Sequence, residues 1–385
     1  MCCAQRVQHT KSSHNTMKIT CLGGGHEVGR NSFLVETKTK KITFDAGLHV
    51  EDGGLPQMPK TNVDACFITH GHLDHLGSAP VLHKQTRAKM HMTPPTLDFS
   101  QLLLHEAIKV AKIKERNPHF QPADILSMVR DYSKVNYDDE IKLDQHTKMD
   151  IWDAGHIPGS AMFLLKSEGK KILYTGDFKL DPTKLTSGAR IQAEGADVLI
   201  MESTYSAREQ PDRKEEEKKL WGIIRDTVES GGKVLLPSFA SRAPEILMIL
   251  EQFGADFPIY LDGMAKAATE ITLKYPEYTR DFKKLKSAVE MAIPLYENEE
   301  RNNAMKEPCI IVTTGGAMEG GPIVHYMKNL YADEKSSVIF TGYQIPKTAG
   351  RYMLDTGRYI VGAIDFKVKM KIHSLSFSSH ADRTE

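Results

Sequence analysis

Apolar and polar positions along the first two hundred residues alternate mostly with the short period of β-strands. After a polar beginning, short segments rich in β-branched residues follow one another and are bounded by turn residues. A helical excursion with apolar residues at helical spacing interrupts them, and strand-like segments then return. We expect strands at residues 17–25, 31–37, 40–47, 64–70, 148–156, 161–169, 170–178 and 196–204, and helices at 97–116 and 123–132.

The pattern changes after Glu202, where short buried strands alternate with amphipathic helices. Such alternation predicts a parallel sheet whose crossovers are helical. Farther along, Lys367, Lys369 and Lys371 fall on one strand face, which favours either a basic wall or an edge strand protected by lysines. We expect a helix within 208–230, a strand and a helix within 232–254, and strands at 257–265, 308–316, 336–343 and 359–364.

Length and charge narrow the class of protein. A chain of 385 residues predicts two domains. Lys and Arg together number 50, as do Asp and Glu, so the formal net charge is zero. This balance argues against a nucleic-acid binder held by bulk charge, but it leaves room for a local basic groove.

Cysteine usage and the amino-terminal stretch suggest the compartment. The five cysteines are scattered and include no CxxC pair, which favours a reducing cytoplasm over a disulfide framework. Residues 1–16 lack the apolar run of a secretory signal and predict a flexible tail. No apolar run approaches the roughly 18 residues that a membrane span needs. We therefore expect a cytoplasmic protein without a membrane partner.

The segment THGHLDHLG, residues 69–77, concentrates metal-binding side chains directly after a predicted strand. His70 and His72 can point the same way, because alternate residues of extended backbone share a side. Asp74 and His75 would face a neighbouring position, so the motif can serve two ions. A chance histidine-rich loop is the alternative interpretation.

Three more residues of ligand type favour the metal site over that alternative. Asp45, His156 and Asp177 each come just after a predicted strand. One aspartate at a strand end is often a turn or a cap, but three such residues in strand order indicate a common site.

At this point the sequence resembles the metallo-β-lactamase superfamily. THGHLDH, GHIPGS and YTGDF match its signature motifs, and MESTYSAREQPDR, PSFASRAPEIL, TTGGAMEGGP, TGYQIPKTAGR and SFSSHAD resemble landmarks of its β-CASP branch. The resemblance implies an α/β fold, namely an αββα metallo-β-lactamase sandwich with an inserted β-CASP α/β domain. It divides the chain into a tail (1–16), a metallo-β-lactamase domain (17–206), a β-CASP domain (207–371) and a return to the first domain (372–385).

The resemblance also implies a role for each site residue. His70, His72 and His156 would bind one zinc ion, Asp74 and His75 a second, and Asp177 would bridge the two. Asp45 would orient a ligand imidazole. Glu202 and His380 would pair near the leaving group, so that Asp74, Glu202 and His380 form the catalytic set.

The implied activity is that of a zinc-dependent ribonuclease of RNA processing or decay. Two ions would activate a hydroxide for attack on a phosphodiester. The alternatives are a non-catalytic or impaired RNA-binding β-CASP subunit and a metallo-β-lactamase-fold hydrolase of small substrates. The sequence leaves open whether RNA is cut internally or from an end, and it leaves the oligomeric state open, with a homodimer as one alternative. Candidate RNA contacts are Arg242, Gly315, Gly316, His325, Lys347 and Arg351.

The sequence departs from the family pattern at three places. The glycine loop at residues 313–322 is one residue longer, and Lys347 stands where a glycine is expected. The sequence ends five residues after His380, whereas in the family one more histidine completes the second zinc site. We therefore expect a fragment or truncated chain whose second site lacks its last ligand.

Overall fold

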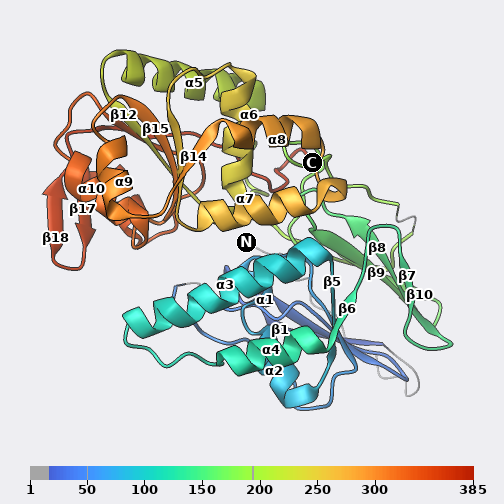
Figure 1. Cartoon of the computed structure of the whole chain (residues 1–385). Coiled ribbons are helices and arrows are strands. Elements are labelled where there is room, and N and C mark those ends of the chain that lie inside the picture. Colours follow the sequence, from blue (N-terminus) through green and yellow to red (C-terminus); the bar gives the residue numbers. More distant parts are fainter. Residues whose placement is uncertain (1–16, 50, 193–194) are drawn as a thin grey trace. The chain divides into compact units, whose positions relative to one another are not determined.

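The computed structural model describes residues 17–49, 51–192 and 195–385 and divides the chain into two compact units (Figure 1). The first unit comprises the residues up to Ala207 together with Ser379–Glu385, and the second comprises Arg208–Ser378. Each unit combines helices with sheets, so the predicted α/β fold is confirmed. The expected tail, residues 1–16, lies outside the described residues.

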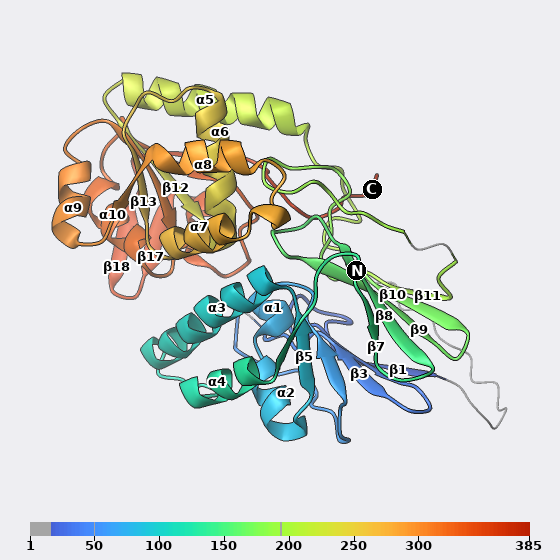
Figure 2. The same cartoon turned by 45° about the vertical axis from the view of Figure 1, so that its right-hand side comes forward.

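Two β-sheets form the framework of the first unit (Figure 2). The first three strands of one sheet pair antiparallel, and the following three are parallel. In the other sheet, one edge strand is parallel and the remaining pairs are antiparallel. In spatial order the first sheet is β1 (Lys18–Gly23), β2 (Ser32–Glu36), β3 (Lys41–Phe44), β4 (Ala65–Phe67), β5 (Lys89–Met92) and β6 (Tyr132–Lys134), and the second is β11 (Val198–Ile200), β10 (Lys170–Tyr174), β9 (Ala161–Ser167), β8 (Thr147–Asp153) and β7 (Glu140–Lys142).

Apolar side chains from both sheets meet in a shared core. Phe44 of the first sheet stacks on Phe163 of the second, with ring centroids 6.2 Å apart, and Phe67 of the first sheet contacts Phe163 edge-on, with centroids 5.3 Å apart. Because inward and outward positions alternate along each strand, one face of each sheet fills this core. The outer face of the second sheet is covered by loop residues, among them Phe178 and Ala381.

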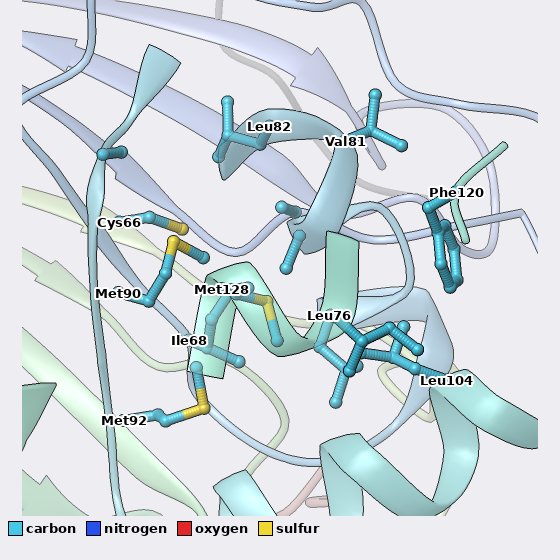
Figure 3. Packing of buried hydrophobic residues seen from close by; sticks show 14 of the residues in the cluster. Cys66, Ile68, Leu76, Val81, Leu82, Met90, Met92, Leu104, Phe120 and Met128 are labelled. Carbon is cyan, nitrogen blue, oxygen red and sulfur yellow. The ribbon is translucent and has the colours of Figure 1, made fainter. Parts of the chain in front are cut away.

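Four helices cover the outer face of the first sheet (Figure 3). Their apolar residues Leu76, Leu82, Leu104 and Met128 pack with sheet residues such as Cys66 and Met90. This packing holds the connection between β4 and the first helix, which carries the histidine-rich motif. The helices are α1 (Leu73–Leu76), α2 (Ala79–Thr86), α3 (Pro94–Ile113) and α4 (Pro122–Arg130).

The second unit is built on a parallel sheet between helices, as the alternation of strands and helices predicts. Its spatial strand order is β14-β13-β15-β12-β16-β19, and every pair is parallel. The strands are β12 (Lys233–Ser238), β13 (Ile259–Asp262), β14 (Ala292–Leu295), β15 (Cys309–Thr314), β16 (Ser337–Phe340) and β19 (Lys371–Ser374); the α-helices are α5 (Arg213–Glu229), α6 (Ala243–Gln252), α7 (Met264–Lys274), α8 (Phe282–Glu290), α9 (Asn298–Ala304), α10 (Pro322–Leu330) and α11 (Ala349–Thr356).

Three expectations for the end of this unit differ from the structure. The predicted buried strand 359–364 is instead a hairpin of β17 (Arg358–Val361) and β18 (Ile364–Lys367), because Gly362 turns the chain with φ +58°. The three lysines do not share one strand, since Lys367 ends β18 and Lys371 begins β19. We also expected the first domain to resume at residue 372, whereas residues 371–374 pair with β16 and the first unit resumes at Ser379.

Candidate metal centre

The histidine-rich motif is held by a buried carboxylate at its first residue. Thr69 follows β4, and its backbone N–H donates to Asp45 Oδ1 at 2.7 Å. The Thr69 hydroxyl lies 2.9 Å from Asp45 Oδ2 and 3.0 Å from His70 Nδ1. These contacts fix the direction in which the chain leaves the strand, so His70 and His72 enter the site from a rigid base.

Four side chains gather in the first ligand group: His70, His72, His156 and Asp177. One ligand atom from each lies within 4.8 Å of the others. His156 comes from the connection between β8 and β9, and its Nδ1 lies 2.8 Å from the Ser379 carbonyl oxygen. That contact orients Nε2 towards the group, where it lies 3.8 Å from Asp177 Oδ2.

A second group, Asp74, His75 and Asp177, shares Asp177 with the first. His75 Nε2 lies 3.3 Å from Asp177 Oδ1 and 3.7 Å from Asp74 Oδ2. Asp177 is brought close by Gly176, which has φ +54° and whose hypothetical Cβ would lie 2.7 Å from the Thr69 side chain. A side chain at position 176 would therefore push the bridging carboxylate away from the motif.

Asp45 lies behind the ligands and is completely buried. Its carboxylate accepts from the Tyr174 hydroxyl at 2.6 Å and lies 2.6 Å from His75 Nδ1. A proton on His75 Nδ1 satisfies this contact and leaves Nε2 with its lone pair directed at the ligand group. The structure thus places the Asp45 carboxylate against Nδ1 of His75, and its role in orienting a ligand imidazole stays a prediction.

His380 and Glu202 form a pair at the edge of the ligand groups. Nδ1 of His380 lies 3.0 and 2.9 Å from the two Glu202 carboxylate oxygens and 3.9 Å from Asp177 Oδ2. Glu202 is itself oriented by the Phe178 backbone N–H, which donates to it at 2.9 Å. Ala381 N donates to the Phe178 carbonyl at 2.6 Å, so one loop positions both members of the pair.

Burial and neighbouring charges shift the ionisation of the site. Burial holds the pKa of His70 and His156 well below the ordinary value and lowers the pKa of His72 to about 4. Burial also opposes charge on His75, but the carboxylates of Asp177, Asp45 and Asp74 together raise its pKa. For His380 burial is likewise outweighed, by Glu202 and Asp177, and the pKa rises to about 9.

The chemistry of these side chains fits divalent metal ions. Neutral imidazole nitrogens and ionised carboxylates are the ligands that such ions prefer, and burial keeps His70, His72 and His156 neutral. Against its burial, the nearby imidazoles keep the pKa of Asp177 well below its ordinary value, so it stays ionised. Because Asp177 belongs to both groups, the pair of groups suits two neighbouring ions.

The predicted RNA contacts all lie in the second unit, and three of them, Arg242, Arg351 and His325, each contact a neighbouring side chain. Arg242 Nη2 lies 3.1 Å from Glu245 Oε2, Arg351 Nε lies 2.9 Å from Asp355 Oδ2, and His325 Nε2 lies 3.0 Å from Asn302 Oδ1. Gly315 and Gly316 follow β15, and Lys347 adopts φ +67°, the backbone conformation that glycine favours.

Several residues of the centre were not predicted from sequence. Tyr174 and Thr69 bind Asp45, Ser379 orients His156, and Asn31 lies beside His75. Thr69 and Tyr174 are the first residues of the motifs THGHLDHLG and YTGDF, so their positions carried a local signal. Asn31 lies 44 positions before His75, and nothing near it in the chain points to a metal centre.

Comparison with protein families matches residues 26–217 to the metallo-beta-lactamase superfamily and residues 243–353 to the Beta-Casp domain. None of the described helices is long and apolar enough to cross a membrane.

Among curated proteins, the chain is 35% identical over 381 residues to "Probable RNase MJ4" of Methanocaldococcus jannaschii, covering 96% of this chain and 89% of the relative. It is 33% identical over 374 residues to "RNase aCSPSF2" of Saccharolobus solfataricus, covering 95% of this chain and 75% of the relative. It is 35% identical over 413 residues to "Transcription termination factor FttA" of Pyrococcus horikoshii, covering 96% of this chain and 63% of the relative.

Among solved structures, the fold is similar to a protein of unknown function from Enterococcus faecalis V583. The TM-score is 0.62 at 17% sequence identity, covering 95% of this chain and 89% of that one. At this identity the likeness concerns the fold alone.

Proposed function

This chain belongs to the metallo-beta-lactamase superfamily, carries its Beta-Casp domain and is a metal-dependent hydrolase, and we propose that its substrate is RNA. Two relatives that it covers over most of their length bear the name RNase. The observation that carries the proposal is the convergence of two ligand groups on Asp177, with the His380–Glu202 pair beside them. A shared ligand and an adjacent proton-carrying pair are what hydrolysis of a phosphodiester needs.

We further propose that the resident ions are zinc. The first ligand group has three imidazoles and one carboxylate, and nitrogen-rich sets of four ligands favour zinc over magnesium or calcium. Divalent ions held there would supply positive charge that polarises a phosphate and lowers the pKa of water. His70, His72 and His156 with Asp177 would hold one ion, and Asp74, His75 and Asp177 would hold the other.

In this proposal His380 handles the proton of the leaving group. Glu202 accepts from Nδ1 of His380, so Nε2 is the nitrogen that would give a proton to the departing oxygen. Glu202 fixes both the tautomer and the ring direction, as the carboxylate partner of a catalytic imidazole commonly does. In the second unit, Arg242, Gly315, Gly316, His325, Lys347 and Arg351 remain the proposed contacts to the RNA backbone.

Replacing His380 tests the proposal. We expect the His380→Ala variant to cleave a labelled RNA 10²- to 10⁴-fold more slowly, roughly the loss of a general acid. Its metal content, counted by elemental analysis, should stay that of the wild type, because His380 belongs to neither ligand group that we assign. His146→Ala, which removes an exposed histidine, is the matched control and should leave cleavage unchanged.

The same assay separates the alternatives. Metal content with no RNA cleavage by the wild type would contradict the ribonuclease and support an RNA-binding subunit. Hydrolysis of small esters without RNA cleavage would support a hydrolase of small substrates. Unchanged cleavage by His380→Ala would exclude its role in proton transfer.

A further inference from the structure

Asn31 lies beside the second ligand group without belonging to it. Its side-chain Nδ2 lies 3.1 Å from Nε2 of His75, the nitrogen that faces Asp74 and Asp177. Since Nδ1 of His75 is held by Asp45 at 2.6 Å, Nε2 is the nitrogen that can bind an ion. The Asn31 amide thus faces the ligand atom itself.

The orientation of the Asn31 carboxamide is determined by its surroundings. Nδ2 donates to the Asp74 carbonyl oxygen at 3.2 Å, and the Asn31 backbone N–H donates to the same oxygen at 2.8 Å. A flipped amide would place two oxygens against each other there. The N–H₂ end therefore points at both the Asp74 carbonyl and His75 Nε2.

The backbone around Asn31 is shaped to hold this carboxamide. Gly24 has φ +82°, and a Cβ there would lie 2.4 Å from Asn31 Oδ1. The Asn31 carbonyl oxygen accepts from Gly47 N at 2.9 Å. Backbone contacts on both sides of the residue thus fix it against the Asp74–His75 turn, and its amide can withdraw only by breaking the hydrogen bond to the Asp74 carbonyl oxygen.

An electropositive amide end at this position acts against a cation. A cation on His75 Nε2 would lie close to this N–H₂ group, whose partial positive charge repels it. In the first ligand group, Nε2 of His70 and Nε2 of His156 lie 3.1 and 3.3 Å from Nδ1 of His72, an imidazole nitrogen that can itself offer a lone pair to an ion, whereas an amide N–H₂ cannot. An ion therefore meets more electrostatic repulsion at the second ligand group than at the first.

We propose that Asn31 weakens ion binding at Asp74, His75 and Asp177 and thereby sets the order in which the two groups fill. The first group fills at low ion concentration, and the second fills only at a higher concentration, because the ion must approach His75 Nε2 against the Asn31 amide. The inference rests on the proposed two-ion centre and concerns its loading, not its substrate. It makes Asn31 a specificity-determining residue for the second ion.

Calorimetric titration of the metal-free protein with Zn²⁺ tests this inference. Asn31→Ala should strengthen the weaker binding step roughly fivefold, the factor typical of one polar contact of a neutral group, and should leave the stronger step unchanged. Asp74→Asn identifies the weaker step, because it should abolish or further weaken that step alone. Asn136→Ala removes a half-buried asparagine elsewhere in the first unit and should change neither step.

Each outcome of the titration decides the question. An unchanged or weakened second step in Asn31→Ala overturns the inference. If the wild type shows a single step, a second step gained by the variant supports it, and one step in both proteins overturns it. If Asn31→Ala does not fold, as judged by circular dichroism, Asn31→Ser is titrated with the same expectation. Because no RNA is present, the result is independent of whether RNA is the substrate.

Discussion

At the scale of single residues, the centre depends on Asp45, whose carboxylate serves three elements at once. It binds Thr69 after β4, His75 in α1 and Tyr174 at the end of β10. Asp45 itself adopts φ +57°, which places its side chain beneath the motif. Such a conformation is costly for a residue other than glycine and persists where the surrounding contacts determine it. The hydrogen bonds of Thr69, His75 and Tyr174 to its carboxylate hold Asp45 in this conformation.

A different buried residue, His91, makes stability depend on pH. His91 in β5 stacks on Phe67 with ring centroids 4.5 Å apart and is 4% exposed. Burial, assisted by Lys89, lowers its pKa from 6.5 to about 4. The folded protein thus keeps His91 neutral, whereas the unfolded chain takes up a proton below pH 6.5. The contribution of His91 to stability is full above pH 6.5 and declines by about 3 kcal/mol as the pH falls towards 4.

Denaturant unfolding at pH 7 and pH 4.5 measures this effect. His91→Phe keeps a flat ring in the stack and removes the titrating group, so its loss of stability between the two pH values should be smaller than that of the wild type. His146→Phe, at an exposed position, should behave as the wild type does. An equal loss in wild type and His91→Phe would assign the acid sensitivity to other groups.

At the scale of elements, the sequence predicted those parts whose signals are local. The strands of the first unit alternate plainly, and His70, Asp74, His156 and Asp177 stand just after them, so both the strands and the candidate ligands could be found. β5 was missed because Lys89–Met92 is too short to show a period. The segment 359–364 was predicted as one buried strand, yet of its apolar residues Tyr359 is buried and Ile360 is 38% exposed.

What could not be predicted depends on contacts between distant segments. β19 joins the second unit because Lys371–Ser374 pairs with β16, and its own four residues do not specify a partner. Asn31 and Ser379 reach the centre only through the fold. Lys347 stands where a glycine was expected, and it adopts the positive φ of that glycine, so the turn is kept by the surrounding chain.

One buried ion pair joins three elements of the second unit and leads to a prediction. Asp262 at the end of β13 accepts from Arg301 of α9 at 2.7 and 2.9 Å and from the Tyr326 hydroxyl of α10 at 2.7 Å. Asp262 is completely buried. Asp262→Ala leaves the Arg301 charge without its partner, so we expect the second unit to lose about 3 kcal/mol or more of its free energy of unfolding.

Denaturant unfolding monitored through Trp221 of α5 measures that loss, in a Trp152→Phe background. Asp365→Ala breaks an exposed pair with Arg358 in the same unit and should cost only about 0.5 kcal/mol. A loss for Asp262→Ala as small as that of this control would show that the pair does not hold α9 and α10 to the sheet.

At the scale of the whole molecule, the two units have separate cores and unequal shares of the chemistry. Every residue of the two ligand groups, together with Glu202 and His380, lies in the first unit, although His380 follows the second unit in the chain. Sequence order thus separates residues that the fold unites. Ions bound only by the folded first unit should stabilise that unit alone, since ligands stabilise the state that binds them.

The two tryptophans of the chain allow this to be measured. Trp152 lies in β8 of the first unit and is buried, while Trp221 in the second unit stacks on Phe253 with ring centroids 5.7 Å apart. In single-tryptophan variants, addition of a chelator should lower the unfolding midpoint reported by Trp152 and leave that of Trp221 unchanged. Free ion at a thousand times its dissociation constant would add about 4 kcal/mol to the free energy of unfolding of the first unit. In His70→Ala, which lacks a ligand of the first group, the chelator should have a much smaller effect. Equal shifts at both tryptophans would mean that the units unfold together, and no shift at Trp152 would contradict the metal centre.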